Sequence, residues 1–325
     1  MNKLTDGISK ADIEIRPYQL LSTICFLGGV ECQLPEKDTI INIIKQVGNN
    51  PALRIRLVSD ADEIPYYKYI KSDDYTQMEK IFNRKRDLDV LQKLGLMAGD
   101  TRRARYLYEL LFQRIKTPKG ICAYDTNGWE GCPHADSGVY ESIINKSFAE
   151  IVYMRDDEER KAYKKASVSE IQKAERLYIR PHHLMCMCCH YDGGRGDFPS
   201  DQNNLYELLK RIQEKPTIQI VLVEGCCMVC DPCDGYDPKT DRCVHGGGLI
   251  RDYKKDLDVF QKLGLMPGST MKAVDLFKLL FERIPSTKDV CGYGDGVVTS
   301  HEWSICGGTD GNEAYRRTLD KWIFN

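Results

Sequence analysis

The chain has 325 residues, enough for two domains of ordinary size, and its 42% share of hydrophobic residues favours folded cores over disorder. Its 46 basic and 48 acidic residues give a net charge of -2, which excludes the strongly basic surface typical of nucleic-acid-binding proteins. No run approaches the eighteen or so apolar residues of a membrane-spanning helix, and Asp12 and Glu14 stand where a secretory leader would be basic. We therefore expect a cytoplasmic protein with no membrane and no nucleic-acid partner.

Taken in chain order, the sequence contains two copies of one unit. Residues 87–115 and 256–284 are identical at 19 of 29 positions without a gap. Upstream of these segments, residues 15–20 align with residues 179–184, and both begin Ile-Arg-Pro. Two copies are too few for a solenoid. We expect tandem units over residues 1–154 and 177–325, joined by a densely charged helical linker over residues 155–176.

Within the second copy the pattern predicts a helix, a strand, a cysteine-rich loop and two further helices. Ser200 is a candidate N-cap for the first helix, in which Leu205 and Leu209 share one face. Residues 217–223 are rich in β-branched side chains and predict a strand. Two glycines and a proline at residues 264–268 separate the last two helices. The predicted fold class is α+β: two tandem copies of a mostly helical unit with a short strand and cysteine-rich loops.

The fourteen cysteines are unevenly distributed, and ten of them lie from Cys186 onward. A reducing compartment disfavours disulfides, so metal ligands are the better interpretation. Cys227, Cys230 and Cys233 are spaced Cys-x-x-Cys-x-x-Cys, and Cys243 follows. Three thiolates on one short loop with a distant fourth favour an iron–sulfur cluster, [4Fe-4S]. A zinc site, which usually has two well-separated cysteine pairs, and catalytic or incidental thiols stay open as alternatives.

A second group of candidates precedes this loop. His182 and His183 stand beside Cys186 in the sequence RPHHLMC. Either histidine is a candidate non-cysteine ligand or proton donor, because imidazole titrates near neutral pH and binds metals. The alternative is a structural pair in which one ring bonds to the backbone and the other is exposed.

The segment RPHHLMC, the Gly-rich segment after it, the Asp-Pro-Cys loop and the Leu-Gly-Leu helix pair resemble the family described as domain of unknown function 1284. The resemblance covers residues 179 to about 306, and the opening motif is its most specific part. Members of that family are suspected of binding an iron–sulfur cluster and have no assigned activity. The resemblance implies, as candidate ligands, Cys186, Cys230, Cys291 and Cys306, and more loosely Cys233 and Cys243.

This chain departs from the family pattern in two places. Asp197 and Phe198 follow the Gly-rich segment, where the family usually continues Tyr-Ser. Only Cys291 precedes Trp303, where the family commonly has a Cys-x-x-Cys pair. The resemblance therefore leaves the full ligand set open, and ten cysteines suit either one cluster with spare thiols or two clusters.

The first copy lacks most of these candidates. Tyr18 stands where the second copy has His182, Ser22 stands in place of Cys186, and Cys122 and Cys132 are retained. We expect a scaffolding unit that packs on the second copy, which would make the monomeric chain a pseudodimer. The two retained cysteines are either buried thiols without a role or additional ligands.

Three functions follow from these patterns. The first is a redox or electron-transfer protein with a thiolate-ligated cluster and an unknown redox partner. The second is an enzyme that uses an open-site iron–sulfur cluster on a small-molecule substrate, with His182 or His183 as acid–base partner. The third is a zinc-stabilised interaction module without catalytic chemistry. We expect the first and keep the other two as alternatives.

Overall fold

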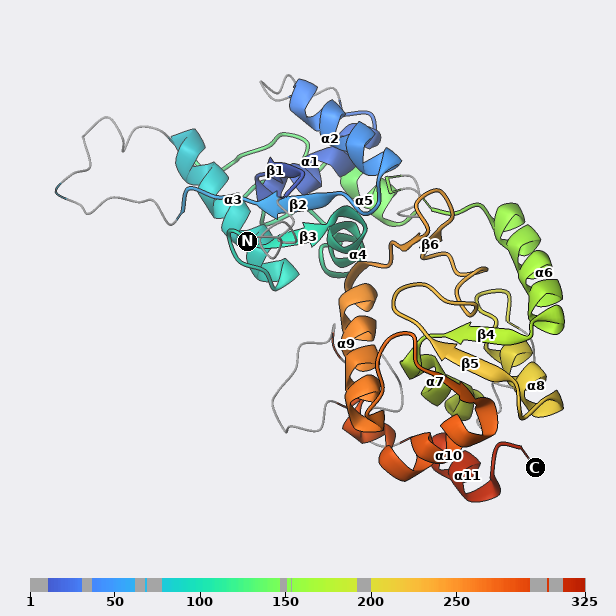
Figure 1. The fold of residues 1–325 in the computed structure, drawn as a ribbon. Helices are drawn as coiled ribbons and strands as arrows, with labels where there is room; N and C mark the ends of the chain where they lie inside the picture. Colours follow the sequence, from blue (N-terminus) through green and yellow to red (C-terminus); the bar gives the residue numbers. More distant parts are fainter. Residues whose placement is uncertain are drawn as a thin grey trace, which may run out of the picture. The chain divides into compact units, whose positions relative to one another are not determined.

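The computed structural model describes residues 11–30, 37–61, 68, 78–146, 151–152, 154–191, 200–292, 303 and 312–324. Over these residues the chain forms eleven α-helices and eight short strands (Figure 1). It divides into two compact units, Met1–Tyr153 and Met154–Asn325, hereafter unit 1 and unit 2. The predicted α+β class is confirmed. Within the described ranges, no helix combines the length and apolar character needed to cross a membrane.

Unit 1 combines a three-stranded sheet with five helices. In chain order its elements are β1 (Ile13–Ile15), α1 (Pro17–Leu27), α2 (Lys37–Asn49), β2 (Arg54–Leu57), α3 (Met78–Leu94), β3 (Thr101–Arg103), α4 (Ala104–Arg114) and α5 (Val139–Ile144). Strand β2 lies in the centre of the sheet, parallel to β1 and antiparallel to β3. Helix α1 packs against α2, α3 and α5.

Unit 2 repeats this arrangement and adds a helix at its start and a two-stranded hairpin. Its elements are α6 (Asp157–Lys173), β4 (Arg176–Ile179), α7 (Pro181–Tyr191), α8 (Leu205–Glu214), β5 (Gln219–Leu222), β6 (Tyr236–Asp237), β7 (Arg242–Cys243), α9 (Gly246–Leu263), β8 (Thr270–Lys272), α10 (Ala273–Arg283), a 3₁₀ turn (Thr287–Asp289) and α11 (Glu313–Lys321). Strand β5 is central, parallel to β4 and antiparallel to β8. Helix α7 packs against α8, α9 and α11.

The two units therefore share one sheet topology. The predicted strand at residues 217–223 is confirmed as β5. Its neighbours β4 and β8 are additional to the single strand predicted for each unit. They have only four and three residues, too few for a periodic pattern to emerge.

An ion pair between an arginine and a buried aspartate fixes α1 to α3 in unit 1 and α7 to α9 in unit 2. Arg180 Nη2 lies 2.7 Å from Asp256 Oδ2 in unit 2, and Arg16 Nη2 lies 2.6 Å from Asp87 Oδ2 in unit 1. The other carboxylate oxygen accepts the backbone N–H two residues after the arginine, at 3.2 Å in unit 2 and 3.3 Å in unit 1. The intervening proline opens the helix at a position where its missing N–H costs nothing.

A second shared contact lies at the far end of each core. The Tyr140 hydroxyl donates to the carbonyl of Ile115 at 2.9 Å, and the Tyr315 hydroxyl donates to the carbonyl of Ile284 at 2.7 Å. Both tyrosines are fully buried in separate hydrophobic cores. The two units therefore share contacts at positions that the repeated sequence aligns.

Two local expectations differ from the structure. The helix predicted to begin at Ser200 begins at Leu205, and the Ser200 hydroxyl instead accepts the N–H of Gln202 at 3.1 Å. The charged segment predicted to link the two copies is α6, a part of unit 2. Ile171 on α6 joins the core of unit 2, and Lys164 forms a 2.7 Å ion pair with Glu207 on α8. The buried positions of α6 are Arg160, Ser167 and Ile171, so only one of them is apolar, and the segment reads as a charged linker in the sequence.

Candidate metal centre

The cysteine-rich loop between β5 and β6 is held in consecutive tight turns. The N–H of Cys230 donates to the carbonyl of Cys227 at 2.7 Å, and the N–H of Cys233 donates to that of Cys230 at 2.9 Å. The N–H of Met228 donates to the carbonyl of Tyr178 at 3.1 Å, which ties the loop to the end of β4. The Cys-x-x-Cys-x-x-Cys spacing thus places one thiol at each successive turn.

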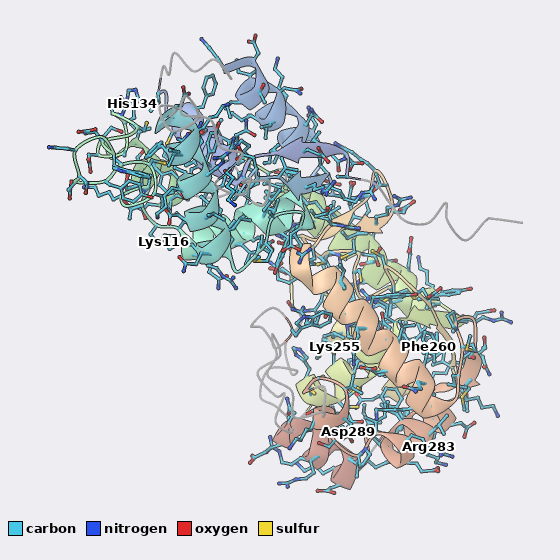
Figure 2. The ribbon with its side chains drawn as sticks, turned by 90° about the vertical axis from the view of Figure 1, so that its left-hand side faces the viewer. Lys116, His134, Lys255, Phe260, Arg283 and Asp289 are labelled. Atoms are coloured by element: carbon cyan, nitrogen blue, oxygen red, sulfur yellow. The ribbon has the colours of Figure 1, made fainter. Side chains whose placement is uncertain are left out.

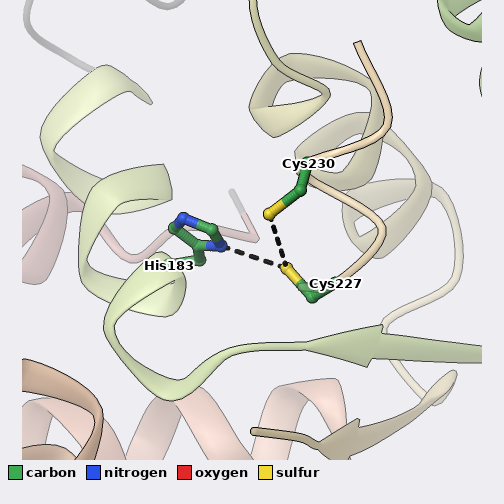
Figure 3. A group of neighbouring side chains, drawn as sticks. All are labelled: His183, Cys227 and Cys230. Atoms are coloured by element: carbon green, nitrogen blue, oxygen red, sulfur yellow. Dashed lines mark hydrogen bonds between the residues drawn. The ribbon is translucent and has the colours of Figure 1, made fainter. Parts of the chain in front are cut away.

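Helix α7 brings a histidine to this loop. His183 Nδ1 lies 3.1 Å from the sulfur of Cys227, which lies 4.0 Å from the sulfur of Cys230 (Figure 3). The three ligand atoms all lie within 4.8 Å of one another, and we call them the His183 group. Among the predicted candidates, these three therefore meet in one place.

The His183 group favours a metal-binding protonation state. Burial, followed by the charge of His182, lowers the pKa of His183 to about 3, so its ring is neutral at physiological pH. Hydrogen bonds from the thiols of Cys226 and Cys227 lower the pKa of Cys230 far below that of a free thiol. Burial raises the pKa of Cys227. The group thus contains a thiolate at Cys230 and a neutral imidazole at His183. These are the protonation states in which cysteine and histidine bind metals.

The neighbouring His182 is oriented by a different contact. Its Nδ1 lies 2.7 Å from Asp256 Oδ1, in a pocket where both side chains are buried. Burial opposes ionisation of Asp256, but the hydrogen bond from His182 and the charge of Arg180 outweigh it and lower its pKa. A carboxylate on one ring nitrogen fixes the imidazole and leaves the other nitrogen for a ligand or a proton.

A cavity of about 350 Å³ joins these side chains. Six cysteines from four separate segments line it: one on α7, three on the loop between β5 and β6, one on β7 and one after the 3₁₀ turn, namely Cys186, Cys226, Cys230, Cys233, Cys243 and Cys291. His182, His183 and His245 line it as well. Helix α9 contributes Asp252 and the buried Lys255 to the lining. Figure 2 labels Lys255 on this helix. The cavity is therefore rich in soft ligands, and two buried cations, Arg180 and Lys255, also line it.

The structure gathers most of the predicted site residues. Five of the seven predicted cysteines line the cavity, and Cys227 adjoins it through its 4.0 Å contact with Cys230. Cys306 lies outside the described residues. The sulfur of Cys233 lies 3.2 Å from Nε2 of His245, which the sequence analysis did not select. Its position two residues after Cys243 is the signal that would have found it. Cys226 was also missed, although it directly precedes Cys227.

Unit 1 has a smaller cavity built from equivalent positions. It has a volume of about 50 Å³, and Ser22, Arg86 and Cys122 line it where unit 2 has Cys186, Lys255 and Cys291. Cys25 and Cys132 also line it. Burial raises the pKa of the Cys122 thiol to about 11, so this thiol is protonated at neutral pH. Unit 1 thus keeps the outline of the site with three thiols and a cation.

Comparison of the whole chain with protein-family models, curated proteins and solved structures gave no match. The resemblance inferred from the RPHHLMC motif therefore stays a prediction.

Proposed function

We propose that unit 2 binds an iron–sulfur cluster, of the [4Fe-4S] type, in the cavity lined by its cysteines. The observation that carries this proposal is that six thiols from four chain segments line one cavity of about 350 Å³. A single metal ion occupies only the small space between its four ligand atoms. A cluster of several metal and sulfide atoms needs a cavity between the cysteines that bind it. Thiolates are also the usual ligands of such clusters.

The residues present fit this group. Cys227 and Cys230 supply thiols from the loop, and Cys186 and Cys291 supply thiols from other segments of the wall. Arg180 also lines the cavity, and its positive charge offsets the negative charge that thiolates bring into a buried site. When bound, the cluster supplies a one-electron couple. We propose electron transfer with a redox partner as its role.

The orientation of His182 favours a second candidate, an enzyme acting on a small molecule. Asp256 holds the Nδ1 edge of the ring at 2.7 Å, and His182 lines the cavity. A histidine held in this way can pass a proton to or from a molecule that enters the cavity. An alanine at position 182 that changes turnover of a substrate but leaves the iron content intact would support this role. Unchanged turnover would leave electron transfer as the function.

The spacing of the His183 group favours a third candidate, a zinc ion. Two thiolates on one tetrahedral zinc lie about 3.8 Å apart, from Zn–S bonds of about 2.3 Å. The sulfurs of Cys227 and Cys230 lie 4.0 Å apart. Zinc thus accounts for this pair, while the remaining thiols and the cavity volume favour the cluster.

The deciding experiment is anaerobic purification of the whole chain, followed by iron, acid-labile sulfide and zinc counts and an absorption spectrum. We expect a brown protein with about four irons and four sulfides per cluster. The Cys230→Ser variant should lose this iron, while Cys25→Ser, a matched control in unit 1, should keep it. A colourless protein with stoichiometric zinc would reject the cluster.

We further propose that the protein works in the cytoplasm as a monomer. Among the described residues, the twelve cysteines form no disulfide bond with one another, which suits a reducing compartment. The two tandem units would make a second chain unnecessary. Light scattering that reports a dimer would contradict the monomer, and a folded chain with oxidised, paired cysteines in the native host would contradict the location.

A further inference from the structure

We infer that Cys233, Asp234 and His245 form a second, mononuclear site for a divalent cation of the zinc class, separate from the ligands of the proposed cluster. Their donor atoms all lie within 4.8 Å of one another, and we call them the His245 group. Cys233 and Asp234 come from the end of the cysteine-rich loop, and His245 precedes α9. The hairpin β6–β7 joins the two segments and closes the site.

The distances within the His245 group match those of a tetrahedral zinc ion. Bonds of about 2.3 Å to sulfur and about 2.0–2.2 Å to nitrogen and oxygen place ligand atoms about 3.4–3.6 Å apart. His245 Nε2 lies 3.2 Å from Cys233 Sγ and 3.4 Å from an oxygen of Asp234, and that oxygen lies 3.7 Å from the sulfur. Sulfur, imidazole nitrogen and carboxylate oxygen are all zinc ligands, and the mixture is unlike the all-thiolate set of a cluster.

The backbone of the loop supports this geometry. The N–H of Gly235 donates to the sulfur of Cys233 at 3.3 Å, which stabilises a thiolate at that position. A Cβ at residue 235 would lie 2.0 Å from the imidazole ring of His245, so only glycine allows the ring to approach the sulfur. The sulfur of Cys233 therefore has a histidine nitrogen within ligand distance, at 3.2 Å.

The site has a consequence for chemistry. Within the described residues, the His245 group contains three donors. Zinc sites with three protein ligands keep a fourth position for water or substrate, which is the pattern of catalytic rather than structural zinc. Cys233 and His245 both line the cavity, so an ion held between them would border the space that a small molecule could enter.

The test is the zinc content of the whole chain after equilibration with Zn²⁺ and removal of free metal. We expect His245→Ala to bind one zinc equivalent fewer than the wild type, with its iron and sulfide content unchanged. His134→Ala, the matched control in unit 1, should bind as much zinc as the wild type. Gly235→Ala keeps all three donors but displaces the ring, and it should lose the same equivalent.

Cys230→Ser separates this inference from the proposed function. This variant removes a thiol from the proposed cluster, so it should lose iron or a His183-bound zinc but keep the equivalent that His245→Ala loses. Circular dichroism that matches the wild type checks that each variant is folded. Equal zinc content in the wild type, His245→Ala and Gly235→Ala would overturn the inference, whether or not the protein contains iron. An iron-free protein in which the difference persists would reject only the cluster.

Discussion

The Arg180–Asp256 ion pair offers a sharp test of how unit 2 is stabilised. We consider Asp256→Asn, which keeps the shape of the side chain and removes its charge. Asp256 is fully buried, and it faces both the guanidinium of Arg180 at 2.7 Å and the ring of His182 at 2.7 Å. Removal of one partner leaves a buried arginine without a counter-charge.

The magnitude follows from burial. Breaking a buried ion pair by removal of one partner costs about 3–5 kcal/mol. For a unit of this size, each kcal/mol lowers the melting temperature by about 2–4 °C, so the expected loss is about 6–20 °C. In unit 1 the equivalent Arg16 is 26% exposed and also pairs with Asp60. Burial raises the pKa of Asp87, so its ionised form contributes less to the stability of unit 1 than the ionised form of Asp256 contributes to unit 2. Asp87→Asn should therefore cost about 1.5 kcal/mol.

The assay is hydrogen exchange of the β4–β5 and β1–β2 amides, which reports the opening of each unit separately. The pH dependence has a definite sign. The folded pKa of Asp256 lies below its ordinary value of 3.8, so its stabilisation is complete above that value and is lost as the pH falls through the folded pKa. Asp256→Asn should abolish this acid-sensitive part. A loss below about 1 kcal/mol, or one no larger than that of Asp87→Asn, would refute the reasoning.

Three other predictions concern the shared core and the metal. Tyr140→Phe and Tyr315→Phe each remove one buried hydrogen bond and should cost about 0.5–1.5 kcal/mol in urea unfolding, whereas costs that differ by more than about 1 kcal/mol would contradict an equivalent role. Removal of metal by a chelator should lower the stability of unit 2 by about 2.7 kcal/mol relative to metal at a hundredfold excess over its dissociation constant, with no change in unit 1 by hydrogen exchange. Metal affinity should fall about tenfold for each pH unit of acidification and for each thiol proton that binding releases. The cause is that burial raises the pKa of Cys233 to about 12 and also raises the pKa of Cys243, so both thiols must lose a proton to bind metal. Competitive titration with a metal indicator would measure the affinity, and an affinity independent of pH would contradict the prediction.

Much of the fold was predictable because its strongest signals are local or repeated. The duplication is visible as identity between residues 87–115 and 256–284, and the loop between α9 and β8 is marked by Gly264, which ends α9 with a φ of 67°. The strands β1 and β4 were missed because three or four residues carry too little alternation. They are held by pairing with β2 and β5, a non-local interaction that no window of sequence contains.

For the candidate site, the residue types were predictable but their grouping was not. Spacing in the loop predicts that Cys227, Cys230 and Cys233 act together. The structure places Cys230 and Cys233 in the lining of one cavity, and the close approach at Gly235 also brings the ring of His245 to the Cys233 sulfur. The contact between His182 and Asp256 spans 74 positions in the chain and depends on how α7 packs on α9. Spacing rules describe one loop, while this site is made where separate elements converge.

If unit 2 binds the proposed cluster, the differences between the two units favour a role for it in function more than in folding. Unit 1 has the same sheet topology, an equivalent Arg–Asp pair and the same tyrosine hydrogen bond as unit 2. Yet at cavity-lining positions it has Ser22 for Cys186 and Arg86 for Lys255, and its cavity is smaller. A fold that forms without most of the donors does not need the metal to hold its core together. A zinc module whose folding depends on its ion predicts the opposite, so metal-free unit 2 should retain its β4–β5–β8 sheet.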